Sequence, residues 1–256
     1  MGILTGEEGD PVALENADAR GRVILVCEHA SRQLPKALGT LGLSEEALAS
    51  HIAWDPGALA VARRIASELD ATLIFQRFSR LAYDCNRPPE SPAAMPEKSE
   101  IFDIPGNAGL DQAARGARTQ ALYLPFRDAL SRLVKGRIAE GRAPVIVTIH
   151  SFTPIYFGQP RAVEIGVLHD SDTRLADAML AAANRAGDRY DVRRNEPYGP
   201  ADGVTHTLKE HGLANGLANV MVEVRNDLIQ DEAGERAVAG YLAGLIVEGL
   251  SSPELL

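Results

Sequence analysis

The sequence contains only two cysteines, Cys27 and Cys85, among its 256 residues. Two thiols are too few for the disulfide framework of a small secreted protein, and we expect both to stay reduced in a cytoplasmic environment. Basic side chains are also in deficit, with 26 Lys and Arg against 35 Asp and Glu and a formal net charge of −9. This balance argues against a nucleic-acid-binding protein, which needs clustered surplus Lys and Arg to neutralise phosphates.

No stretch of the chain carries the roughly 20 consecutive apolar residues that a membrane-spanning helix needs. The first ten residues, MGILTGEEGD, are acidic and lack the basic flank and apolar stretch of a secretory signal. We therefore expect a cytoplasmic protein with neither a membrane nor a nucleic acid as partner. The motifs G-x-S-x-G, G-x-G-x-x-G and H-E-x-x-H and the Walker loop are also missing.

Apolar runs that alternate with amphipathic segments predict an α/β fold with a mostly parallel sheet flanked by helices. We expect a tail over residues 1–21 and a single domain over residues 22–256. Strands are predicted at 22–27, 71–75, 144–149, 163–168, 191–193 and 219–224. Helices are predicted at 55–69, 114–139, 173–186, 205–213 and 232–250. Residues 86–107 hold five of the fifteen prolines and predict a long irregular loop, a feature that is often functional.

Polar side chains follow three of the predicted strands at the points where the strands end. Glu28 and His29 follow the first strand, and His150 follows the third. Glu223 lies at the end of the last strand. Ligands of open α/β sheets bind in the crevice outside the carboxyl ends of the strands, so we expect these distant residues to meet in space.

Two histidines and one carboxylate are the ligand set of a catalytic zinc site, which leaves a fourth position for water. His29 and His150 are the imidazole candidates. Asp55 is the preferred carboxylate because it opens a helix beside the sheet edge, although it could instead be the N-cap of that helix. Zinc, or another divalent metal, would lower the pKa of bound water to about 7 and polarise a carbonyl group.

Glu223 is the candidate general base. Burying a glutamate in an apolar strand costs free energy, unless the carboxylate forms an ion pair or takes part in catalysis. A structural ion pair with Arg225 is the competing interpretation. Cys27 is a weaker candidate for a nucleophile, because a thiol that ends a buried strand usually belongs to the core. His169 is predicted to have a structural role.

Arginines beside these motifs indicate an acidic substrate. Arg80, Asn86 and Arg87 lie in one segment at the start of the Pro-rich loop. Arg225 lies two residues beyond Glu223, on the same side of an extended chain. Guanidinium groups bind carboxylates through two parallel hydrogen bonds, so these residues are the candidate substrate contacts.

The chain resembles the N-formylglutamate amidohydrolase family in six segments, which appear in family order and span roughly residues 22 to 250. The segments are Val26-Cys27-Glu28-His29-Ala30-Ser31, His51-Ile52-Ala53-Trp54-Asp55-Pro56-Gly57-Ala58, Ser79-Arg80 through Asp84-Cys85-Asn86-Arg87-Pro88, Ile149-His150-Ser151-Phe152, Asn195-Glu196-Pro197-Tyr198, and Val222-Glu223-Val224-Arg225-Asn226-Asp227-Leu228-Ile229.

This resemblance implies a phosphorylase/hydrolase-like α/β fold, related to zinc carboxypeptidases and to zinc-dependent N-acetylmuramoyl-L-alanine amidases. The metal ligands and the glutamate of those amidases match His29, Asp55, His150 and Glu223. The family reaction is the hydrolysis of N-formyl-L-glutamate to formate and L-glutamate. The resemblance therefore makes residues 22–256 an N-formylglutamate amidohydrolase-like catalytic domain.

We expect a zinc-dependent amidohydrolase that cleaves the amide bond of a small acidic N-acyl amino acid. His206, in Thr205-His206-Thr207, is an additional candidate contact to an oxyanion or a carboxylate. A zinc-dependent peptide or peptidoglycan amidase is the second hypothesis, and the missing signal peptide and the Pro-rich loop speak against it. The third hypothesis is a non-catalytic protein that binds an acidic metabolite.

Overall fold

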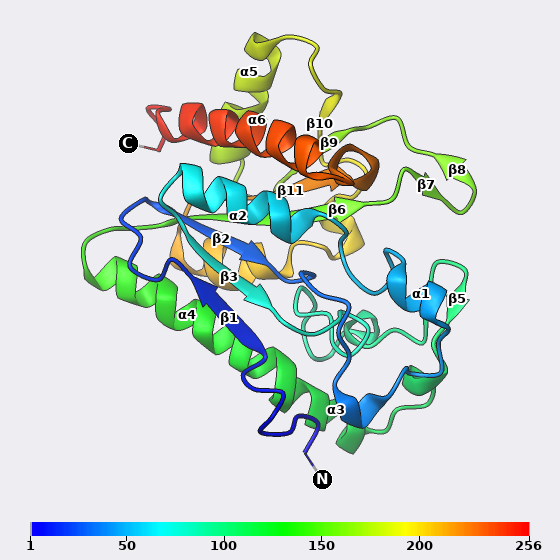
Figure 1. The fold of residues 1–256 in the computed structure, drawn as a ribbon. Helices are drawn as coiled ribbons and strands as arrows, with labels where there is room; N and C mark the ends of the chain where they lie inside the picture. The colour runs from blue at the N-terminus through cyan, green and yellow to red at the C-terminus, as the bar shows by residue number, and fades with distance from the viewer. Residues whose placement is uncertain (1, 256) are drawn as a thin grey trace.

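A seven-stranded sheet forms the centre of the computed structural model, which describes residues 2–255 (Figure 1). Its strand order is β1-β3-β2-β6-β11-β9-β10. The bounds are β1 Val12–Glu15, β2 Val23–Cys27, β3 Thr72–Gln76, β6 Val145–Phe152, β9 Ile165–Leu168, β10 Val192–Arg194 and β11 Asn219–Arg225. Strands β3, β2, β6 and β11 are parallel, while β1 at one edge and the β9–β10 pair at the other run in the opposite direction. The prediction of a mostly parallel sheet in a single α/β domain is confirmed.

The central strands are apolar runs because both of their faces are covered. In β2, Val23 and Leu25 belong to the hydrophobic cluster on one face of the sheet, whereas Ile24 and Val26 belong to the cluster on the other. Successive side chains of a strand point to opposite faces, so a strand buried on both sides needs apolar residues at every position. All five residues of β2 are buried.

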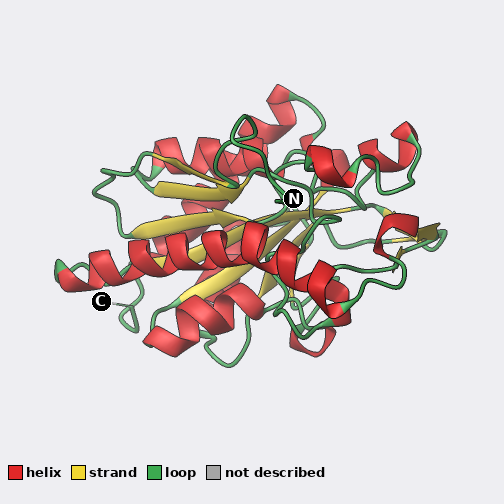
Figure 2. Cartoon of the chain, turned by 90° about the horizontal axis from the view of Figure 1, so that it is seen from below, coloured by secondary structure: helices red, strands yellow, loops and turns green. Residues whose placement is uncertain are grey.

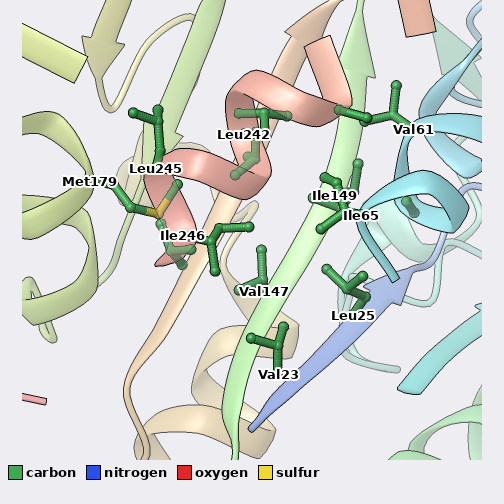
Figure 3. Close-up of a cluster of buried hydrophobic side chains, with 14 of the residues drawn as sticks. Val23, Leu25, Val61, Ile65, Val147, Ile149, Met179, Leu242, Leu245 and Ile246 are labelled. Carbon is green, nitrogen blue, oxygen red and sulfur yellow. The ribbon is translucent and has the colours of Figure 1, made fainter. Parts of the chain in front are cut away.

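Helices form a layer on each side of the sheet (Figure 2). Helices α2 (Ala58–Glu68), α5 (Arg174–Ala186) and α6 (Glu232–Leu250) cover one face, and α6 contacts both α2 and α5. Figure 3 shows part of the core between these helices and the sheet, with Val61 and Ile65 of α2, Leu242 and Ile246 of α6, and Val147 and Ile149 of β6. Helix α4 (Leu124–Ala139) covers the opposite face beside β1 and β3. The short helix α1 (Glu45–Ala49) lies at the periphery (Figure 1).

The helix predicted over residues 114–139 divides into α3 (Gln112–Arg118), a π-helical turn at Thr119–Tyr123 and α4. The N–H group of Leu124 donates to the carbonyl of Thr119, five residues earlier. Pro125 follows, and its ring nitrogen has no proton to donate to the preceding turn. The wide turn lets the helix continue through a proline that would otherwise interrupt it.

The segment expected as a tail, residues 1–21, is in part ordered against the domain, because β1 pairs with β3 along four residues and forms the sheet edge. The Pro-rich loop contains a small hairpin, β4 (Lys98–Ser99) with β5 (Phe102–Asp103). A second hairpin, β7 (Ile155–Tyr156) with β8 (Gln159–Pro160), follows β6. No helix among residues 2–255 is long and apolar enough to cross a membrane.

Candidate metal and catalytic site

The strand ends of the parallel sheet bring the predicted site residues together. His29 follows β2, and His150 lies near the end of β6. Glu223 of β11 is the register partner of His150. Asp55 precedes α2, and its backbone N–H donates to the carbonyl of His29 at 2.9 Å, which fixes the helix entry beside the first strand end.

Three of these side chains form a compact cluster. Oδ2 of Asp55 lies 3.2 Å from Nδ1 of His29 and 3.0 Å from Nδ1 of His150, and the two ring nitrogens lie 3.2 Å apart. Donors held at ~2.0–2.1 Å around one tetrahedral zinc ion would lie roughly 3.3–3.4 Å from each other. The spacing, the N₂O donor set and the complete burial of the cluster are therefore compatible with a divalent metal ion.

Each histidine uses its second ring nitrogen to contact a further carboxylate. Nε2 of His29 lies 2.7 Å from Oδ1 of Asp84, and Nε2 of His150 lies 3.1 Å from Oε2 of Glu28. The contact between His29 and Asp84 is a hydrogen bond, which keeps the proton on Nε2 and leaves Nδ1 free to bind a metal. The contact between His150 and Glu28 is an ion-pair contact without hydrogen-bond geometry in the described chain, and its negative charge favours a proton on Nε2 of His150. Asp84 also accepts a hydrogen bond from Nη2 of Arg80 at 2.9 Å.

The electrostatics of the cluster favour a cation. Burial works against a charged imidazole, but the neighbouring Glu28 and Asp55 outweigh it and raise the pKa of His150 well above its usual value. Burial alone would raise the pKa of Asp55, yet His29 and His150 hold it well below the usual range. The site holds four buried carboxyl groups, Asp55 within the cluster and Glu28, Asp84 and Glu223 around it, and among residues 2–255 Arg80 is the one arginine that forms an ion pair with any of them. Excess negative charge in a dry site attracts a metal ion.

Glu223 is a buried carboxyl group without a fixed partner. Its Oε2 atom has no hydrogen-bond partner among residues 2–255, although the side chain faces the cavity beside the cluster. Burial, assisted by the negative charge of Asp55, raises the pKa of Glu223 to about 7. A carboxyl group with such a pKa can accept and release a proton near neutral pH.

The alternative role of Asp55 as a helix cap is wrong. Helix α2 begins at Ala58 with Gly57 as its N-cap, and no side chain caps it. Gly57 has a φ of 78°, and a Cβ atom there would lie 2.5 Å from the carbonyl oxygen of Ile229. The left-handed turn at Gly57 starts the helix, so the Asp55 carboxylate remains free for the two histidines.

A cavity of ≈ 570 Å³ opens above the cluster. Ser99 and Glu100 of the Pro-rich loop form part of its wall, as does Tyr156 of β7. Glu100 links these parts, because its carboxylate contacts Nε2 of His51 at 2.9 Å and accepts a hydrogen bond from the N–H of Phe157 at 2.8 Å. The loop is therefore tied to the neighbouring segments at the cavity mouth.

Comparison with known proteins decides the family. The profile of the N-formylglutamate amidohydrolase family matches residues 21–230, which is most of the chain. The chain belongs to that family. Members of this family are amidohydrolases that act on carbon–nitrogen bonds. The protein is therefore a hydrolase.

Two solved structures are similar to this family member. A gene product from Agrobacterium tumefaciens is 62% identical, with a TM-score of 0.96, and the match covers 98% of this chain and 99% of that one. An N-formylglutamate amidohydrolase from Ralstonia eutropha JMP134 is 19% identical, with a TM-score of 0.62 and coverage of 96% and 99%. The similarity to the Ralstonia eutropha structure shows a shared fold alone. A comparison with curated proteins gives no match.

Three of the predicted substrate contacts of this N-formylglutamate amidohydrolase family member line the cavity, namely Arg80, Asn86 and Arg87. The amide group of Asn86 is already used: Nδ2 donates to the carbonyl of Val204 at 2.6 Å and Oδ1 accepts from the N–H of Thr207 at 3.0 Å. Asn86 therefore holds the wall segment in place. Arg87 donates to the carbonyls of Asn86 and Gly203, both at 2.9 Å.

Arg225, another predicted substrate contact, does not join the other candidates at the cavity. Its guanidinium lies 3.3 Å from Glu164 and 2.8 Å from Asp227, and it is absent from the cavity lining. Strand β11 ends at this residue, and the side chain turns toward the segment before β9. For the same reason the ion pair between Arg225 and Glu223 does not form.

His206, the additional candidate contact, also lies outside the cavity lining. Its Nε2 atom lies 2.8 Å from the hydroxyl of Tyr123, in the π-helical turn before α4. Burial lowers the pKa of His206, so the neutral ring is favoured. Cys27 is fully buried in the core and its thiol pKa is raised by burial, as expected for a structural cysteine.

Sequence reasoning missed three functional candidates. Asp84 lies within a quoted family segment, and its position four residues after Arg80 could have indicated an ion pair. Arg161 and Tyr198 line the cavity as well. Arg161 follows a hairpin of two-residue strands, which carries no periodic signal. Tyr198 lies in a loop, and its place in the family segment Asn195-Glu196-Pro197-Tyr198 could have indicated it.

Proposed function

We propose that the chain is a metal-dependent amidohydrolase that hydrolyses N-formyl-L-glutamate, or a closely similar acidic N-acyl amino acid, to the acid and the free amino acid. The observation that carries this proposal is the His29–Asp55–His150 cluster with the unpaired carboxyl group of Glu223 beside it. The family assignment supports the reaction class. The cavity of ≈ 570 Å³ is within the size range of small-molecule sites.

His29, Asp55 and His150 would hold the metal, for which zinc fits the donor set. When bound, such an ion acidifies water and polarises the carbonyl group of an amide. Glu28 and Asp84 keep the two imidazole rings in the orientation that points Nδ1 inward. Arg80 holds Asp84 and contacts Oδ1 of Asp55 at 3.4 Å, which limits the rotation of both carboxylates.

Glu223 moves the proton in this proposal. Hydrolysis adds the oxygen of water to the acyl carbon, breaks the carbon–nitrogen bond and requires one proton at the leaving nitrogen. Oε2 of Glu223, which has no other partner within residues 2–255, accepts a proton from the attacking water and returns it to the amine. Its pKa of about 7 suits both halves of this transfer.

The test combines metal analysis with a substrate screen. Purified protein is analysed for bound metal and then assayed, with and without added Zn²⁺, on N-formyl-L-glutamate, other N-acyl amino acids and muropeptides. We expect one metal ion per chain and turnover of the acidic N-formyl substrate. Turnover of muropeptides alone would support a peptidoglycan amidase, and acidic-ligand binding without bound metal would support a non-catalytic binding protein.

A further inference from the structure

Three aromatic rings hold the guanidinium group of Arg161 at the cavity wall. The group lies 4.3 Å from the ring centre of Tyr156, 4.9 Å from that of Tyr198 and 5.6 Å from that of Phe152. The backbone N–H of Arg161 donates to the carbonyl of Pro154 at 2.8 Å, which closes the β7–β8 hairpin. Side chain and backbone are thus both fixed before a ligand arrives.

The positive charge of Arg161 is not neutralised by the protein. Arg80 pairs with Asp55 of the metal cluster and with Asp84 beside it, and Arg225 pairs with Glu164 and Asp227. Arg161, in contrast, makes no ion pair with any residue in the range 2–255. Aromatic rings attract a cation through their quadrupole but leave its net charge intact.

Tyr198 adds a second donor next to this charge. Nη1 of Arg161 donates to the hydroxyl oxygen of Tyr198 at 2.9 Å, so the hydroxyl proton is free to point elsewhere. Burial, together with the charge of Glu223, raises the pKa of Tyr198 to about 12, and the hydroxyl therefore keeps its proton at neutral pH. Arg161 and Tyr198 line the same cavity as Glu223 and the His29–Asp55–His150 cluster.

We propose that Arg161 and Tyr198 form the subsite that binds one carboxylate of the substrate. A guanidinium N–H and a phenol O–H together match the two oxygens of a carboxylate. Arg87, the other cavity arginine without a carboxylate partner among the described residues, would face the second carboxylate of a dicarboxylic substrate. This inference rests on the proposed function, because it names the residues that recognise the acidic part of the N-acyl amino acid.

The experiment compares N-formyl-L-glutamate with its two monoamides, N-formyl-L-glutamine and N-formyl-L-isoglutamine, on the metal-loaded enzyme. For Arg161→Met we expect the KM of N-formyl-L-glutamate to rise about tenfold or more, with a smaller change in kcat. The monoamide that lacks the carboxylate bound by Arg161 should show about the same KM in both enzymes. Arg161→Lys should recover part of the loss, because it restores the charge without the fork, and Tyr198→Phe should give a smaller rise in KM.

Arg189→Met is the matched control. The Arg189 guanidinium stacks over Tyr190 and Tyr241 at 5.5 and 5.8 Å, so this variant removes a similar cation–π contact outside the cavity lining. We expect its KM values to equal those of the wild type. An equal rise in KM for the dicarboxylate and for both monoamides in Arg161→Met, or no rise at all, would overturn the carboxylate subsite.

Binding of L-glutamate, measured by calorimetry on wild type and on the Arg161 and Tyr198 variants, separates this inference from the proposed function. If the wild type binds L-glutamate and Arg161→Met does not, while no N-acyl amino acid is hydrolysed, the subsite stands and the proposed reaction is wrong. If hydrolysis proceeds with unchanged KM and unchanged L-glutamate affinity in the variants, the reaction stands and the subsite is wrong. Should Arg161→Met fail to fold, Arg161→Lys and Tyr198→Phe decide by the same criteria.

Discussion

Glu223 lies directly opposite His150 in the register of the parallel strands β11 and β6. This pairing places the carboxyl group that lacks a partner beside one of the two metal-ligand candidates, and it is set by backbone hydrogen bonds rather than by a mobile loop. Parallel strands that end at the same edge keep such neighbours at a fixed separation. The relative position of Glu223 and His150 is therefore held by the sheet itself.

Replacing Glu223 by Gln should lower kcat by roughly 10²–10⁴-fold, because the amide cannot accept the proton of the attacking water. The substitution is nearly isosteric and removes a buried group without a partner in the described chain, so we expect no loss of thermal stability. Steady-state kinetics with metal analysis and a melting curve would check this. A variant with bound metal and wild-type kcat would contradict the role of Glu223.

Much of the fold and part of the site were predictable from sequence, for physical reasons. The continuous apolar run at Val23–Cys27 predicts a strand that is buried on both faces between two layers of helices. The residues that follow parallel strands of this kind lie together at one edge of the sheet. The direction of β9 was not predictable, since an apolar run of four residues looks the same in a parallel and an antiparallel pair. Strand β1 was not predicted, because a half-buried segment of four residues is too short to show a periodic pattern of apolar residues.

The differences between the expected and the observed positions of site residues concern side-chain direction. Arg225 was expected on the same side as Glu223 from strand periodicity alone, but β11 ends there and Glu164 offers a carboxylate at 3.3 Å. Arg161, in contrast, was not predicted from the sequence. Its side chain contacts residues of a hairpin and Tyr198, which is distant in the sequence, and no local spacing of residues indicates these contacts. Long flexible cations are placed by tertiary partners, which a sequence pattern does not show.

Glu28→Gln and Asp84→Asn should each weaken metal binding by about 10–100-fold, because the amides no longer fix the ring orientation of His150 and His29. Competition with a chromogenic chelator measures the affinity. Glu8→Gln is a suitable control, since Glu8 is also a buried carboxylate but hydrogen-bonds only Thr5 and Lys36. Equal metal affinity in all three variants and the wild type would show that the outer carboxylates do not orient the ligands.

Gly57→Ala should destabilise the fold and release metal together. The alanine meets both an unfavourable φ of 78° and a carbonyl oxygen 2.5 Å from its Cβ atom, so a loss of more than ~1 kcal/mol is expected. Gly216→Ala is the matched control, because Gly216 also has a positive φ of 65° but has no atom within 4 Å of an added Cβ. Melting curves and metal content of both variants test whether the close approach to Ile229 holds Asp55 in place. If both variants lose the same thermal stability and the same amount of metal, backbone strain alone explains the effect, and the close approach of Gly57 to Ile229 does not hold Asp55 in place.

Metal removal should lower the melting temperature of the wild type. After chelation the site keeps four buried carboxyl groups, Asp55 in the cluster and Glu28, Asp84 and Glu223 around it, and repulsion between their negative charges favours unfolding. A ligand at 100–1,000 times its dissociation constant stabilises the folded state by about 2.7–4.1 kcal/mol, so a clear shift is expected on adding EDTA, with recovery on adding Zn²⁺. Asp55→Asn, which removes the carboxylate shared by both histidines, should melt at the same temperature with and without the chelator. If wild type and Asp55→Asn respond equally to EDTA, the metal binds somewhere other than the His29–Asp55–His150 cluster.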